Sequence, residues 1–340
     1  MSRHVIPFFL LLAVFIGIFF VSVNTSWVSN RYGAEWLQEQ IPGLEVDSFY
    51  VTRQQFIWPD RLRMFGVTAD CRYQKKDIHF QAIEVIVKGT LKSLGQKEPV
   101  RLQISGAQVK TDTLELRDAK LDLIFPIKVL RTKIFEGKGM LIVRKLNFYH
   151  YEAEDISIRF GVNQDQLQVF EATAAVYGGK FQSGQVSFQF KPGALYISWS
   201  ELTGLDAEKL SRLNQILFSG LSGIVNGTWR LVGDLYKVEV LAIMLSMSEG
   251  GTMSPALLDR LIANMREGVS REQLRSLRQT GKLFVFDKAN LYIQNIDSST
   301  LALIVEIEDK ILDLHIQERI IVTAPEGLRA LILKNPNSAP

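Results

Sequence analysis

The chain has 340 residues, of which 47% are hydrophobic and 22% are charged. These values are close to the averages for folded globular proteins, so wholesale disorder is excluded. Its 39 basic residues nearly balance its 36 acidic ones, and it has no dense basic stripe of the kind that binds nucleic acid. A single cysteine, Cys71, excludes an intrachain disulfide and a cysteine-based metal cluster. We expect Cys71 to be a small buried hydrophobic residue.

The first predicted element is a membrane anchor. Val5 to Val23 forms a run of 19 residues without a charge. A helix of this length spans nearly the whole hydrocarbon core of about 30 Å. The alternative is a cleaved secretory signal, but its apolar region would be shorter, and residues 21–24 offer no small-x-small cleavage site. Arg3, on the short side of the run, favours a cytoplasmic N-terminus with the main domain across the membrane.

Beyond the anchor the dominant pattern is alternation of apolar and polar residues. Residues 78–88 read IHFQAIEVIVK, and similar runs occur at 100–104, 113–116, 155–160, 166–170, 186–190, 282–286, 291–294 and 312–316. Strict alternation gives a strand one apolar and one polar face, which is typical of antiparallel sheets. We therefore predict a mainly β fold.

Few helices are expected. A short one is predicted at 34–40, and Asp206 is suited to cap a second. Ser254 and Pro255 open a third, and residues 270–273 resemble the capping box of a fourth. Roughly a dozen or more strands at about 4.8 Å spacing would make a sheet near 60 Å wide. Because so few helices can cover it, the sheet must fold on itself, pack against a second sheet, or keep a groove for an apolar ligand.

No pattern in the sequence indicates an enzyme. It has no Gly-x-Gly-x-x-Gly at the start of a helix and no Gly-x-Ser-x-Gly. Its four histidines are scattered, so we predict no catalytic residue, no metal site and no cofactor. Five glycines instead are expected to permit tight turns or close backbone approach, namely Gly178, Gly179, Gly220, Gly223 and Gly227.

Residues 172–233 carry an ordered set of short elements. A strand runs into Tyr177-Gly178-Gly179-Lys180, and a Gly-x-Val-x-Phe-x-Phe strand starts at Gly184. Another strand ends at Gly204-Leu205-Asp206 before a short helix, and a glycine-rich run covers 220–227. This order resembles the C-terminal signature of the AsmA-like superfamily, which includes the TamB, YhdP and YdbH types. The YdbH-like branch is the most similar, because a helical insert (254–280) and further strands (282–334) follow.

The resemblance implies an N-terminal transmembrane anchor (1–30) and an extracytoplasmic AsmA-like domain (31–340). That domain would be an elongated, curved antiparallel β-sheet forming an apolar groove, with a few short helices. Such a protein would be a single-pass protein of the inner membrane, projecting into the periplasm and transferring phospholipids between inner and outer membranes. Its expected partners are phospholipid, the inner membrane, and envelope proteins or a second copy in a homo-oligomer, but no nucleic acid. The chain is much shorter than the long bridging members, and residues 47–160 are similar only in general character.

Two other functions stay open. One is a structural or assembly factor for outer-membrane biogenesis, whose β domain is filled by its own side chains and binds protein partners. The other is an anchored binding protein for a small apolar solute. If a lipid groove exists, the apolar phase of the strands lines it, although core packing predicts the same side chains and a slip of one residue reverses the faces. The candidate lining residues are Ile156, Ile158, Phe160, Leu167, Val169, Phe188, Phe190, Leu283, Val285, Leu291 and Ile293.

Overall fold

The computed structural model describes most of the chain after residue 43. The described ranges are 30, 34–35, 38, 44–57, 60–73, 76–89, 99–126, 136–149, 151–163, 166–189, 196–211, 219–233, 238–265 and 267–323. The anchor predicted at 5–23 lies outside them. Within these ranges no helix combines the length and the apolar character needed to cross a bilayer. The chain divides into two compact units, Met1–Ala172 and Thr173–Pro340.

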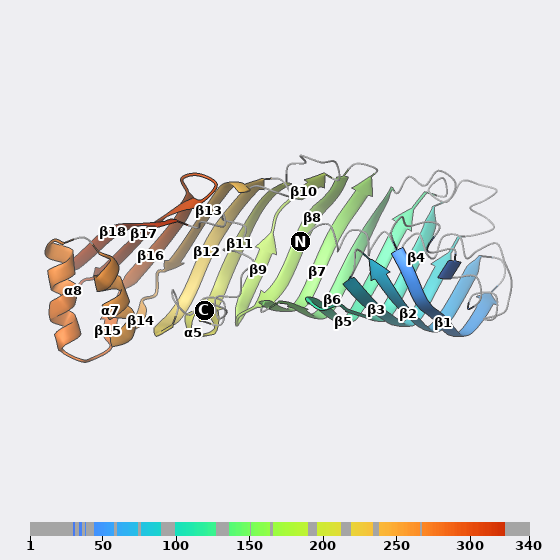
Figure 1. Cartoon of the computed structure of the whole chain (residues 1–340), viewed down its shortest axis with the longest axis horizontal. Helices are drawn as coiled ribbons and strands as arrows, with labels where there is room; N and C mark the ends of the chain where they lie inside the picture. The colour runs from blue at the N-terminus through green and yellow to red at the C-terminus, as the bar shows by residue number, and fades with distance from the viewer. Residues whose placement is uncertain are drawn as a thin grey trace. The chain divides into compact units, whose positions relative to one another are not determined.

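The first unit is an antiparallel meander (Figure 1). Each strand pairs with the next in chain order from β1 to β7. The strands are β1 (Leu44–Ile57), β2 (Arg61–Tyr73), β3 (Lys76–Lys88), β4 (Val100–Lys110), β5 (Leu114–Phe125), β6 (Gly137–Phe148) and β7 (Tyr151–Asn163). β8 (Gln166–Val176) follows and contains the boundary between the units.

Buried and exposed side chains alternate along these strands, but the alternation shifts by one residue near the middle of the sheet. On β2, for example, the buried positions run through Met64 and resume at Val67, so one extra residue is inserted. Four strands carry a residue with positive φ at this level, namely Gly66, Gly106, Asp118 and Asp155. At Gly106 a Cβ would lie 2.4 Å from Cδ1 of Ile83, so a side chain there would have to displace Ile83. Such bulges bend a strand and increase its twist.

The apolar face of the first unit is deeply buried. Met64, Val67 and Leu102 are each 0% exposed, and Leu123 and Phe125 are nearly so. Cys71 is buried on the same face, as predicted from the sequence. Desolvation raises the pKa of its thiol to about 12, with a smaller effect from Asp70 and Asp47. The thiol therefore behaves as a small hydrophobic side chain.

The second unit contains an antiparallel sheet and a smaller ribbon (Figure 1). Its strands are β9 (Gly179–Ser183), β10 (Val186–Gln189), β11 (Tyr196–Asp206), β12 (Leu221–Gly233), β13 (Val238–Met247), β16 (Lys288–Asn295), β17 (Thr300–Asp309) and β18 (Leu314–Thr323). β9 and β10 both pair with β11, and the order then runs β11, β12, β13, β16, β17, β18. β14 (Gly251–Met253) joins the start of β12 to β15 (Phe284–Phe286).

Among the described residues of this unit are the short helices α5 (Ala207–Leu210), α7 (Pro255–Asn264) and α8 (Val269–Gln279). The predicted caps of the first two are confirmed, because Asp206 accepts a bond from the Glu208 N–H and Ser254 from the Leu257 N–H. The capping box predicted at 270–273 is wrong. α8 starts two residues earlier than a cap at Ser270 requires, with Gly268 at the N-cap position and no side-chain cap.

Candidate functional site

The sheet of the second unit has one apolar face with two parts. The first part, which we call the helix-covered core, contains Leu257, Leu258 and Leu274 of the helices packed with Phe284, Phe286, Ile307 and Ile316. The second part, which we call the aliphatic strip, consists of Leu231, Leu241, Ile243, Leu291, Ile293, Leu301, Leu303, Ile320 and Val322. Both parts occupy the same face, because Leu241 and Ile243 share the phase of Leu245 and Met247 on β13.

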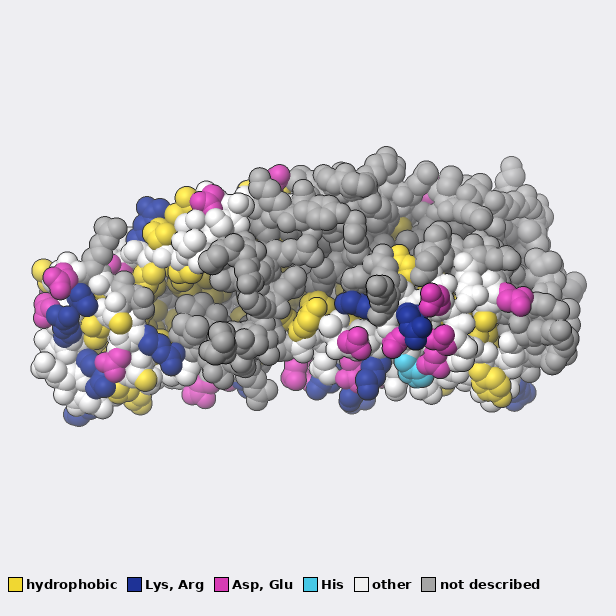
Figure 2. All heavy atoms as spheres, viewed as in Figure 1, with side chains coloured by type: hydrophobic (Ala, Val, Ile, Leu, Met, Phe, Trp, Pro, Cys, Tyr) yellow, Lys and Arg dark blue, Asp and Glu magenta, His cyan; other side chains and the backbone are white. Residues whose placement is uncertain are grey.

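The aliphatic strip runs across neighbouring strands. Ile243 is paired with Ile293, Ile293 with Leu303, and Leu303 with Ile320, so one row crosses β13, β16, β17 and β18. All of its described members lie on strands, and most are only half-buried. Hydrophobic side chains are also visible over this part of the second unit in Figure 2. A row of side chains at cross-strand spacing forms a continuous apolar surface.

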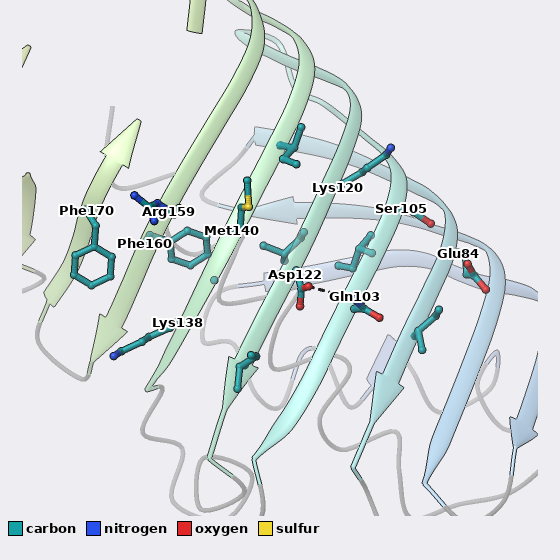
Figure 3. A pocket seen from close by; sticks show the side chains of 16 residues that line it. Glu84, Gln103, Ser105, Lys120, Asp122, Lys138, Met140, Arg159, Phe160 and Phe170 are labelled. Atoms are coloured by element: carbon teal, nitrogen blue, oxygen red, sulfur yellow. Dashed lines mark hydrogen bonds between the residues drawn. The ribbon is translucent and has the colours of Figure 1, made fainter. Parts of the chain in front are cut away.

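A separate hollow lies on the first unit, on the mainly polar face of β3 to β8 (Figure 3). Its volume is about 670 Å³. The phase is clear on β6, where Lys138, Met140 and Ile142 face the hollow while Leu141 and Val143 are buried on the other side. The lining comprises Glu84, Ile86, Gln103, Ile104, Ser105, Lys120, Leu121, Asp122, Ile124, Lys138, Gly139, Met140, Ile142, Arg159, Phe160 and Phe170.

Several apolar side chains of this hollow are exposed to solvent. Ile124 is 44% exposed, Met140 39%, Ile142 41% and Phe170 44%. The Phe170 ring lies beside Gly161, where a Cβ would be 3.0 Å from its Cζ atom. A larger residue at that position would have to displace the ring.

Most charged groups around the hollow are paired. Glu84 accepts a hydrogen bond of 2.7 Å from Nε of Arg63. Asp122 accepts bonds from Arg101 and, at 3.2 Å, from Gln103. The Arg101 bond holds the pKa of the Asp122 carboxyl below its usual value, and partial burial opposes this shift. Arg159 pairs with Glu171.

Two cations of the hollow differ from the rest. Among the residues that the structure describes, no carboxylate oxygen lies within 4.0 Å of the ammonium group of Lys120 or Lys138. Lys138 is directly opposite Gly161 on the neighbouring strand, and Arg159 is directly opposite Met140. Lys138 and Arg159 therefore flank a position that has no side chain.

The structure places the predicted lining residues in different environments. Leu291 and Ile293 belong to the aliphatic strip, Ile156 is 6% exposed, and Ile158, Phe160, Leu167 and Val169 are half-buried. The backbone of Phe188 pairs with Tyr196, whereas Phe190 lies outside the described residues.

Leu283 and Val285 do not lie on the buried phase of their segment. They are 60% and 62% exposed, whereas Phe284 and Phe286 are 4% and 2% exposed. A strand of three residues shows too few alternations to establish its phase, and the larger phenylalanine rings gain more by burial.

The hollow of the first unit was not predicted from the sequence. One signal for it exists, because residues 140–143 read MLIV and are therefore apolar on both phases of β6. Alternation alone assigns only one phase of a strand to an apolar surface. A run without alternation inside an otherwise alternating sheet indicates that the second face also carries apolar side chains.

No family model, curated protein or solved structure matches the chain. The resemblance of residues 172–233 to the AsmA-like superfamily therefore stays a prediction. Within the described ranges no group of three or more His, Cys, Asp or Glu residues is arranged to hold a metal ion. The two surfaces above can exclude water from alkyl groups and attract anions, which is the chemistry of amphiphile binding.

Proposed function

We propose that this chain is an inner-membrane-anchored envelope protein that transfers phospholipids between the inner and outer membranes, and that acyl chains bind along the aliphatic strip. The observation that carries the proposal is the row Ile243, Ile293, Leu303, Ile320, which continues the apolar face beyond the part that the helices cover. The resemblance of residues 172–233 and the predicted anchor at 5–23 support the same function.

The strip has the chemistry that an acyl chain requires. Each methylene group that leaves water for an apolar surface contributes about 0.8 kcal/mol. Crossing four strands at about 4.8 Å spacing gives a path of about 14 Å, which is enough to hold a substantial part of an acyl chain. The strands alternate, so a bound chain would lie on the apolar phase while polar residues such as Gln294 remain on the other.

Photo-crosslinking of the full chain in cells tests the proposal. A benzophenone side chain at Ile293 or Ile320 is compared with the same group at the opposite-phase neighbours Gln294 and Arg319. We expect phospholipid adducts, identified by mass spectrometry, from the two strip positions alone. Equal adducts from both phases, or none from the strip, would overturn the proposal.

One observation favours the alternative function, a structural or assembly factor. The apolar face of the first unit is filled, since Met64, Val67 and Leu102 have no exposed surface. That unit fits an assembly factor whose β domain binds protein partners. In the same crosslinking experiment this function predicts adducts to protein from the edge strands, and no lipid adducts from the strip.

A further inference from the structure

The hollow of the first unit combines features that simple surface exposure does not explain. Ile124, Met140 and Ile142 project from the polar phase of the sheet, where charged residues dominate. On this face Lys138 is opposite Ile124, and Ile142 is opposite Lys120, so the apolar side chains lie between two ammonium groups. Figure 3 shows Lys138 and Lys120 at different ends of the hollow, with Met140 between them.

The charged side chains of the hollow indicate the sign of the ligand's charge. Both carboxylates of the lining, Glu84 and Asp122, are neutralised by arginines. Lys120 and Lys138 have no carboxylate partner within 4.0 Å among the described residues, so their charge is not compensated locally. An anionic group at either lysine would thus meet attraction without displacing an ion pair of that lysine.

The strand register indicates where such a group fits. Gly161 lies directly opposite Lys138, and the ring of Phe170 occupies the space beside this glycine. Arg159 is two residues away on the same strand, within diagonal cross-strand reach of Lys138. Next to this cationic end, Met140, Ile142 and Ile124 form the apolar surface, and Phe170 borders it.

We propose that this hollow binds one molecule of an anionic amphiphile, with its head at Lys138 and its alkyl chain over Met140 and Ile142. The volume of about 670 Å³ lies within the range of small-molecule sites. A bilayer surface is a poorer match, because polybasic membrane sites use clusters of four to eight cations. The site is on another unit and another kind of face than the aliphatic strip, so it does not depend on the phospholipid-transfer proposal.

Calorimetric titration of the full chain in a nonionic maltoside detergent tests the site. The probe is dodecyl phosphate, and the comparison probes are dodecyltrimethylammonium and inorganic phosphate. The probe partitions into the detergent micelles to the same extent with every variant. A difference in measured affinity between two variants therefore comes from binding to the protein. We expect Lys138→Gln and Ile142→Glu each to weaken dodecyl phosphate binding about tenfold, as loss of one charge contact or of the apolar surface should do.

Matched controls use residues outside the hollow. Lys110→Gln on β4 removes an exposed lysine, and Ile311→Glu places a charge at a residue that is 91% exposed. Both should leave the affinity unchanged. Circular dichroism confirms folding of every variant.

Three results would overturn the proposal: equal binding of the cationic probe, displacement by inorganic phosphate alone, or insensitivity to Ile142→Glu. Binding of anionic vesicles without binding of dodecyl phosphate would also overturn it, in favour of a membrane-contacting surface. None of these results bears on whether crosslinkers in the strip capture phospholipid, so the two proposals can fail separately.

Discussion

The two units use the same local structure and differ in how the apolar face is covered. In the first unit the side chains on the apolar face of β1 to β5 are mostly below 10% exposure, with Met64 and Leu102 at 0%. In the second unit helices cover one part of the face, whereas Ile243 and Ile293 in the other part are half-buried. Alternating strands thus supply an apolar face in both cases, and its use depends on what lies over it.

The largest expected effect concerns Cys71, which reports the filled face of the first unit. Because burial raises its pKa to about 12 from the ordinary thiol value of 9.0, the thiolate fraction at pH 8 falls about a thousandfold. We expect alkylation by iodoacetamide in the folded chain to be slower by about that factor than in urea. A cysteine at exposed Tyr50, in a Cys71→Ser background, should react at the unfolded rate. Fast labelling of native Cys71 would show that the face is open.

Removal of Phe286 should cause the greatest loss of stability. It is 2% exposed in the helix-covered core, and truncation of a buried phenylalanine to alanine costs about 3–5 kcal/mol. Val285→Ala on the opposite phase should change the free energy of unfolding by less than about 0.5 kcal/mol. Urea unfolding followed by circular dichroism measures both. Equal losses would mean that β15 has no preferred phase.

A comparison of Leu102→Ala with Ile293→Ala tests the difference between the filled face and the strip. Leu102 is fully buried, so its truncation should cost about 2–5 kcal/mol through lost burial and a cavity. Ile293 is half-buried, so we expect a cost of less than about 2 kcal/mol. Thermal unfolding of the two variants shows which substitution lowers the stability more. A larger loss for Ile293→Ala would identify the strip as ordinary core.

The smallest effect is electrostatic and concerns the rim of the hollow. The pKa of Asp122 is lowered in the folded chain, mainly by the bond from Arg101. Its contribution is therefore complete above the unfolded pKa of about 3.9 and is lost as the pH falls through the lower folded value. The side chain is 34% exposed, so Asp122→Asn should cost less than about 1 kcal/mol at pH 7.

Urea titrations at pH 7 and near pH 2 follow this contribution. The difference between wild type and Asp122→Asn should shrink toward zero at the lower pH, and added salt should reduce it at pH 7. A difference that grows as the pH falls would contradict the assigned pairing.

Much of the secondary structure could be predicted, and less of the candidate sites. The run at 78–88 predicted β3, and Ser254 followed by Pro255 predicted the start of α7. The phase of residues 283–286 could not be established, because it depends on the packing of Phe284 and Phe286 under the helices. Of the aliphatic strip, only Leu291 and Ile293 were predicted.

The amino-acid sequence by itself determined that this chain forms antiparallel strands with one apolar face, because period-two alternation can be satisfied only by a pleated backbone. It also determined the caps of α5 and α7, which are local hydrogen bonds. The tertiary structure decided which apolar faces are filled by side chains, and where bulges at residues such as Asp118 and Asp155 shift the phase of the alternation. It also decided which side chains of β3 to β8 meet in the hollow. These properties depend on register and packing between segments far apart in sequence, which no local pattern encodes.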